Sequence, residues 1–126
     1  VEAAKYDGIN LISLGGAFNP ATSSFVGIFA QQALSDLRIT KAFLCATGVT
    51  VESGMSNTTF LEAEIKRGVV SHASSVILVA DNSKLGHDAT VTFCRLQDIS
   101  TFVTDQKPAP KFVEFCRAHN IRLVWE

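Results

Sequence analysis

Strand-length apolar runs alternate along this chain with longer stretches whose apolar residues recur at helical spacing. Residues 41–46 form a nearly continuous run, as in a strand buried on both faces, and residues 75–80 are the most strand-like part of the sequence. Strands that alternate with amphipathic helices are typical of an α/β fold, so we expect a mainly parallel sheet with helices on both faces. The predicted strands are residues 9–14, 41–46, 75–80, 90–94, 101–104 and 121–125.

The helical stretches carry start and stop signals. Thr59 and Glu62 have the spacing of a capping box, and Glu62 with Lys66 predicts an exposed ion pair one turn apart. Residues 1–8 have the pattern of the last turns of a helix that ends on Gly8. The predicted helices are residues 1–8, residues 24–38, a helix that begins after Thr59, and a last helix opened by Pro108 or Pro110.

The composition fits one packed domain. Of the 126 residues, 47% are hydrophobic and 18% are charged, which provides a core and excludes a disordered chain. The 11 Lys and Arg residues and 12 Asp and Glu residues give a net charge of −1, whereas a domain that grips DNA phosphates usually has a basic face. We therefore expect no DNA binding by these residues alone. We also expect no membrane contact, because the sequence has neither an apolar stretch of about 18 residues nor a signal-peptide pattern.

Three cysteines and three histidines lie at spacings that indicate neither a reactive site nor a metal site. The odd cysteine count without a CxxC pair fits reduced thiols in a cytoplasmic protein. The histidines lack neighbouring ligands at metal spacing. We therefore expect no metal, no cofactor and no catalytic residue. The residues considered are Cys45, Cys94, Cys116, His72, His87 and His119.

Ligands of parallel α/β sheets bind beyond the carboxyl ends of the strands. The first loop there contains Gly15 and Gly16, which allow a sharp turn and a close backbone approach, followed by hydroxyl residues 22–24 at a predicted helix start. A helix N-terminus attracts anions, but a tight turn followed by an N-cap serine explains the same residues. The other loops at this end are residues 47–57, 81–88 and 104–107.

Two of these loops place small or charged residues directly after a strand. Thr47 and Gly48 follow the run at 41–46, where glycine permits either a close approach to a ligand or a plain turn. The turn Asp81-Asn82-Ser83-Lys84 follows the most buried run. Lys84 offers a point charge for a phosphate or for sugar hydroxyls, and Asp81 orients that lysine or accepts from a hydroxyl. A solvated surface turn is the alternative, so the residues alone predict an anion-binding α/β domain.

In order along the chain, five blocks resemble the C-terminal sensor domain of the DeoR family of bacterial transcriptional repressors. The element Asp-x-Ser-Lys-x-Gly after a buried strand, here at 81–86, is the most specific of them. Together the blocks extend over nearly the whole chain. They are LISLGG at 11–16, SSFVG at 23–27, KAFLCATGV at 41–49, VILVADNSKLG at 76–86 and STFVTD at 100–105.

The resemblance implies a partial fold related to ribose-5-phosphate isomerase and glucosamine-6-phosphate deaminase, and a phosphorylated sugar as effector. It also implies a cytoplasmic homo-oligomer that contacts operator DNA only through an N-terminal helix-turn-helix domain. Residues 1–126 then form a single effector domain. The first βα units, an Asp-x-Gly-Thr-Thr loop and the DNA-binding domain are expected upstream of Val1. Carried over by position, the residues that border the sugar-phosphate pocket are Gly15, Gly16, Thr47, Gly48, Asp81, Ser83 and Lys84.

Thr47 bears on the choice between a sensor and an enzyme. Many family members have an aspartate where this chain has Thr47, and in the related isomerases acidic residues of this region take part in proton transfer. A threonine hydroxyl cannot act as a base at neutral pH. We therefore expect a repressor's effector domain without catalytic activity. The alternatives are a sugar-phosphate isomerase or deaminase on the same fold, and an oligomerisation module that uses the apolar segment 112–125.

Overall fold

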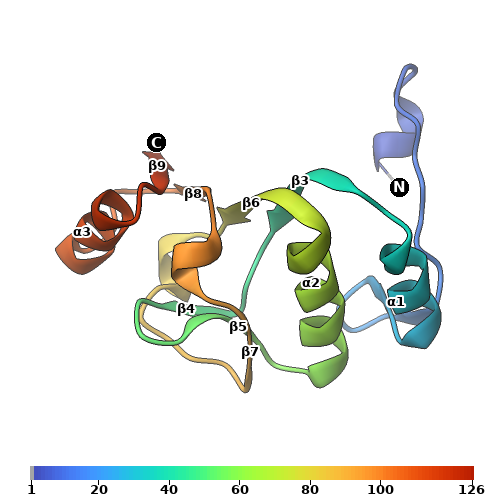
Figure 1. The fold of residues 1–126 in the computed structure, drawn as a ribbon, viewed down its shortest axis with the longest axis horizontal. Helices are drawn as coiled ribbons and strands as arrows, with labels where there is room; N and C mark the ends of the chain where they lie inside the picture. Colours follow the sequence, from blue (N-terminus) through green and yellow to red (C-terminus); the bar gives the residue numbers. More distant parts are fainter. Residues whose placement is uncertain (1) are drawn as a thin grey trace.

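The computed structural model, which describes residues 2–126, contains a four-stranded parallel sheet (Figure 1). The strand order is β3-β6-β8-β9, and every neighbouring pair is parallel. The prediction of a mainly parallel sheet is therefore confirmed, as are the four apolar runs that supply its strands. These strands are β3 (Ile39–Leu44), β6 (Ala73–Val79), β8 (Thr101–Thr104) and β9 (Arg122–Trp125).

The helices lie on one face of this sheet, not on both. The strands follow one another across the sheet in chain order, so right-handed crossovers carry every connection over the same face. In Figure 1, α2 (Phe60–His72) and α3 (Pro110–Ala118) lie on the same side of the strands, and α1 (Ile28–Ser35) packs against α2. The expectation of helices on both faces is therefore not met by these residues.

Burial alternates along β3 because one face of the sheet is uncovered. Ala42 and Leu44 are buried, whereas Phe43 between them is 68% exposed, so the expectation of a strand buried on both faces is wrong for this structure. The paired registers place the open-face residues side by side in neighbouring strands. The apolar members of this open face are Phe43, Ile77, Val79, Val103 and Val124.

The first third of the chain differs most from the prediction. Residues 9–14 form no strand, and residues 9–13 are exposed, with Ile12 at 70%, because no other described strand offers hydrogen bonds to their backbone. The predicted helix 24–38 begins only at Ile28, since Gly27 has a φ of 93°. Its first residues instead pair in a hairpin. The elements here are a 3-10 helix η1 (Glu2–Lys5) that ends before Gly8, β1 (Ala17–Asn19) and β2 (Ser24–Val26).

The loop predicted at 47–57 folds as a buried hairpin. Its strands pair with the segment predicted at 90–94 in a three-stranded antiparallel sheet. Ser56 shows why such polar residues are buried here: its hydroxyl donates to the Gly48 carbonyl at 3.2 Å and accepts from the Ala89 amide at 2.8 Å. The strands are β4 (Gly48–Thr50), β5 (Gly54–Asn57) and β7 (Val91–Cys94), and two short 3-10 turns are η2 (Asn82–Lys84) and η3 (Leu96–Asp98).

Helix α2 begins where the capping box predicts. The Thr59 hydroxyl oxygen accepts from the Glu62 amide, although the Glu62 carboxylate bonds to the Thr59 hydroxyl and not to its backbone amide. Helix α3 begins with Pro110 as its first residue, which confirms one of the two proline starts. No helix within residues 2–126 is long and apolar enough to cross a membrane. The largest fully buried side chains, which mark the core, are Phe102, Phe112, Met55, Leu78, Leu96 and Val49.

Two glycine-to-alanine substitutions are expected to change stability in opposite directions. A Cβ on Gly48 would overlap the backbone carbonyl of His87, so Gly48→Ala should lower the free energy of unfolding by about 1–3 kcal/mol. A Cβ on Gly68, inside α2, would meet only Leu34 at 3.5 Å, so Gly68→Ala should raise it by about 0.5–1 kcal/mol. Urea unfolding of both variants measures the difference, and equal effects would contradict the close backbone approach at Gly48.

Thiol labelling near neutral pH is expected to modify one cysteine of the native chain. Cys45 is exposed, whereas Cys94 and Cys116 are buried. Burial raises the pKa of Cys94 to about 11 and also raises the pKa of Cys116, which removes the reactive thiolate. Mass spectrometry after maleimide treatment should therefore find the label on Cys45, with the other two labelled only after unfolding. Fast native labelling of Cys94 would show that β7 is not packed as described.

Candidate functional site

The carboxyl ends of β3, β6 and β8 bring three polar side chains to one edge of the sheet. Leu44 pairs with Leu78, so Thr47 and Asp81 each follow this pair by three residues in their own segments of the chain. Val79 pairs with Val103, so Asp81 and Asp105 each follow that pair by two residues. This edge, named here the carboxyl-end row, consists of Thr47, Asp81 and Asp105, and it is where parallel α/β sheets bind ligands.

The acidic half of the row borders a cavity of about 300 Å³. Asp105 accepts from the Asn82 amide at 2.7 Å, and the Asn82 side chain donates to the Gln106 carbonyl at 2.9 Å. These bonds tie the loops after β6 and β8 together, and both aspartates line the same cavity. In the sequence, Asp105 appears only as the last residue of the block STFVTD at 100–105. The lining residues are Val79, Ala80, Asp81, Val103, Thr104 and Asp105.

Asp81 is held as a carboxylate by its own turn. One of its oxygens accepts from the Ser83 hydroxyl and from the Ser83 amide, the latter at 2.9 Å. The hydrogen bonds from the Ser83 hydroxyl and amide lower the pKa of Asp81, with a smaller contribution from the charge of Lys84. Ser83 is therefore turned toward Asp81. The side chain of Asp81 is a hydrogen-bond acceptor throughout the neutral pH range.

Lys84 ends the turn η2 and is half-buried. The chain after it is fastened to β4, since Leu85 bridges to Val49 and the Gly86 amide donates to the Val49 carbonyl at 2.8 Å. Within residues 2–126, its ammonium takes part in no hydrogen bond or ion pair of the structure. The sequence-predicted cation therefore stands beside Asp81 with its donors free.

The predicted glycines have structural explanations. Gly48 lies against the His87 backbone, so the close approach it permits is to the protein itself. Gly15 and Gly16 have φ values of 73° and 97° and turn the chain into the β1–β2 hairpin. In Figure 1 their segment and the turn at 81–84 lie on opposite sides of α2. The parallel bridge between Val49 and Leu85 places the chain at Thr47 alongside the turn at 81–84, whereas the segment of Gly15 and Gly16 lies away from that turn.

Lys66 is a site residue that the sequence analysis assigned to the solvated face of a helix. Its ammonium donates to the Cys45 carbonyl at 2.7 Å and to Asn57 Oδ1 at 2.8 Å, and it pairs with no carboxylate in the described chain. Burial lowers the pKa of Lys66, with Cys45 and Glu62 opposing that shift. The available signal was its position one turn after Ala63, which α2 buries.

Lys66 also connects the row to the β1–β2 hairpin. A small cavity of about 70 Å³ separates that hairpin from α2. Its lining residues are Ser24, Phe25, Val26, Glu62, Ile65 and Lys66. The block at 23–27 therefore approaches the site from the α2 side, although the glycines that precede it do not line this space.

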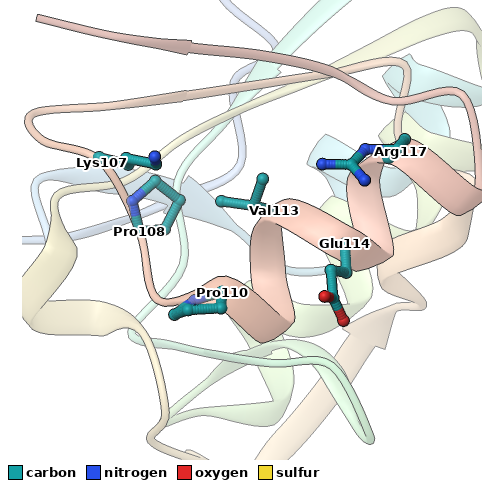
Figure 2. A pocket seen from close by; sticks show the side chains of 6 residues that line it. All are labelled: Lys107, Pro108, Pro110, Val113, Glu114 and Arg117. Carbon is teal, nitrogen blue, oxygen red and sulfur yellow. The ribbon is translucent and has the colours of Figure 1, made fainter.

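A second groove, of about 350 Å³, follows one face of α3 (Figure 2). Lys107 and Arg117 stand at its ends, with Glu114 near Arg117, so its charges are mixed. It shares no lining residue with the two cavities above. The groove is formed by Lys107, Pro108, Pro110, Val113, Glu114 and Arg117.

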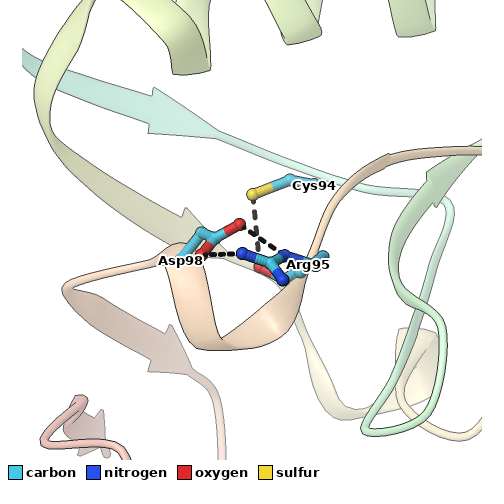
Figure 3. Close-up of polar contacts among 3 residues, drawn as sticks. All are labelled: Cys94, Arg95 and Asp98. Atoms are coloured by element: carbon cyan, nitrogen blue, oxygen red, sulfur yellow. Dashed lines mark hydrogen bonds and ion pairs between the residues drawn. The ribbon is translucent and has the colours of Figure 1, made fainter.

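The polar cluster of Cys94, Arg95 and Asp98 is structural (Figure 3). Arg95 donates to both carboxylate oxygens of Asp98, at 3.0 and 3.1 Å, across the exposed turn η3. The Cys94 thiol donates to the Arg95 carbonyl at 3.3 Å. Nowhere in residues 2–126 do three His, Cys, Asp or Glu side chains gather closely enough to hold a metal ion.

Comparison with known proteins relates the whole chain to transcriptional regulators. It is 35% identical to the HTH-type transcriptional regulator IolR of Bacillus subtilis over 94% of this chain and 47% of that protein. It is 34% identical to the lactose phosphotransferase system repressor of Staphylococcus epidermidis over 78% of this chain and 39% of that protein. It is 36% identical to the HTH-type transcriptional regulator GlpR of Haloferax volcanii over 72% of this chain and 36% of that protein.

This chain spans less than half the length of each of these three relatives. The family model for the DeoR C-terminal sensor domain matches residues 1–106, which include β3, β6, β8 and every member of the carboxyl-end row. The chain therefore belongs to the family of DeoR C-terminal sensor domains.

Proposed function

We propose that this chain is the effector-sensing domain of a cytoplasmic repressor of sugar metabolism, and that it binds a phosphorylated sugar at the carboxyl-end row without catalysing a reaction. The observation that carries the proposal is the pairing of opposite chemistries at one edge. Asp81 and Asp105 accept hydrogen bonds there, while Lys84 supplies a cation with free donors and Lys66 a second one nearby. A sugar phosphate requires both kinds of group. The relatives support the regulatory role, since they are transcriptional regulators and one is a lactose phosphotransferase system repressor.

The remaining parts of the sensor domain and the DNA-binding domain are proposed to lie upstream of these residues. A net charge of −1 gives these 126 residues no electrostatic attraction to DNA. Two features of the fold support further βα units before Val1. Within residues 2–126, β3 pairs only with β6 and so has a free edge, and one face of the sheet is uncovered. Parallel sheets are ordinarily covered on both faces.

Ligand binding acts in this proposal by shifting a population. The sugar phosphate binds one conformation or assembly of a homo-oligomer more tightly than another, and DNA affinity elsewhere in the protein follows that equilibrium. Such coupling requires a contact with two alternative arrangements, and the ligand must prefer one of them.

One observation favours an isomerase or deaminase, namely the two carboxylates on one cavity. General acid–base catalysis requires a group whose pKa lies near the working pH. The hydrogen bonds from Ser83 lower the pKa of Asp81 and move it away from that range. Thr47 supplies no base on the other side of the edge. The geometry therefore supports binding better than proton transfer.

A thermal-shift screen of sugar phosphates against the full-length protein tests the function. A ligand at 100 times its Kd should stabilise the native state by about 2.7 kcal/mol and raise Tm by about 5–10 °C. Unphosphorylated sugars should give smaller shifts. Lys84→Ala should remove most of the shift, whereas Lys111→Ala, at an exposed lysine of α3, should keep it.

Three outcomes would contradict this proposal. If no pentose or hexose phosphate raises Tm, or if Lys84→Ala responds as the wild type does, the sugar-phosphate site is not at the row. Turnover of a pentose phosphate or an amino-sugar phosphate by the full-length protein would replace the sensor with the enzyme.

A further inference from the structure

Lys66, Asn57 and Thr47 form a hydrogen-bond chain whose direction is fixed. A lysine ammonium only donates, so the Asn57 atom at 2.8 Å from it must be the amide oxygen. The Asn57 amide nitrogen therefore faces Thr47 and donates to its hydroxyl oxygen at 3.3 Å. Asn57 is only 5% exposed, so water does not compete to turn this amide around.

The direction of this chain determines what Thr47 offers to a ligand. Its hydroxyl oxygen accepts from Asn57, and its own proton has no acceptor within residues 2–126. The residue is exposed, and its amide donates to the Ser56 carbonyl at 2.9 Å, which fixes its place at the start of the β4–β5 hairpin. Thr47 therefore presents a free donor at its own end of the carboxyl-end row, and a group hydrogen-bonded to that donor must carry an acceptor oxygen.

The distribution of charge along the row also favours an acceptor group at the Thr47 end. Near Thr47, the Lys66 ammonium is held against the end of β3 by the Cys45 carbonyl. At the other end, Asp81 and Asp105 carry negative charge and accept hydrogen bonds. The Lys66 ammonium and Lys84, whose neighbour Leu85 bridges to Val49 two residues after Thr47, attract an anionic group to the β3 end. The Asp81 and Asp105 carboxylates repel that group and suit hydroxyl groups.

From this juxtaposition we infer the orientation of the ligand: its anionic group lies over the end of β3 against Thr47, and its hydroxyl-bearing end lies over β6 and β8 against Asp81 and Asp105. The inference rests on the proposed function. It makes Thr47 a ligand-binding residue and makes Asn57 and Lys66 positioning residues that act through it. The ligand class is a polyhydroxylated compound with one terminal phosphate.

In the full-length protein, substitutions at the two ends of the row should differ in their effects on the affinities for a sugar phosphate and for inorganic phosphate. Calorimetry measures the affinity for the sugar phosphate that gives the largest shift in the screen, and NMR titration measures the affinity for inorganic phosphate. Thr47→Val should weaken both by about tenfold or more, because a hydrogen bond to a charged group is lost, while Thr47→Ser keeps both within about threefold. Asp105→Asn should weaken the sugar phosphate but leave inorganic phosphate unchanged or tighter.

Thr40→Val is the matched control, because Thr40 is an exposed threonine of β3 at the opposite end of the strand. Neither probe should bind it differently from the wild type. The positioning role of Lys66 is tested by a double-variant cycle with Lys66→Met. If Lys66 acts through the Thr47 hydroxyl, its substitution should cost less in the Thr47→Val background than in the wild type. Equal costs in both backgrounds would overturn that role.

The outcomes separate this inference from the function on which it rests. If sugar phosphates bind and Thr47→Val binds them as the wild type does, the orientation is wrong and the sensor stands. If inorganic phosphate binds in a Thr47-dependent way but no sugar phosphate binds, the anionic subsite stands and its sugar ligand is wrong. If neither probe binds the wild-type protein, both are overturned.

Discussion

The order of the four parallel strands decides where every other part of the chain lies. Because β3, β6, β8 and β9 succeed one another in chain order, each right-handed crossover passes over the same face. That face is buried under the helices and the antiparallel sheet, with Leu78 and Phe102 fully buried. The same constraint gathers the carboxyl ends at one edge and leaves Phe43 in water on the other face. The candidate ligand edge and the uncovered surface are two consequences of one topology.

The antiparallel sheet turns that edge into a rigid site, although its own strands are short and polar. Burial of polar residues costs free energy unless each is hydrogen-bonded, and within residues 2–126 every fully buried side-chain nitrogen or oxygen has a partner. Ser56 bonds both to β4 and to the loop before β7. The Asn57 side chain accepts from Lys66 of α2 and donates to the Thr47 hydroxyl. A donor held this firmly reorganises little when a ligand arrives.

The sequence predicts the elements that apolar periodicity specifies and misses those that depend on distant partners. The four sheet strands and the start of α2 are recognisable locally, whereas the β4–β5 hairpin is built from Gly, Ser, Asn and Thr residues that carry no such period. Residues 9–14 show the reverse, since an apolar run becomes a strand only beside another strand. Within the site, topology alone indicates Thr47 and Asp81. The role of Lys66 requires the structure, because a Glu62–Lys66 spacing equally predicts a solvated pair.

A row that donates at one end and accepts at the other discriminates by polarity more than by shape. A ligand that lacks the anionic group leaves the Thr47 donor without an acceptor, and one that lacks hydroxyls leaves two carboxylates desolvated without donors. Such mismatches cost more than a missing methylene does, because polar groups lose their water without compensation. The proposed sensor function needs this kind of selectivity, since its signal would depend on distinguishing a phosphorylated sugar from the same sugar without phosphate. Fixed polarity at the edge therefore favours recognition, whereas catalysis would require groups that exchange protons with the ligand.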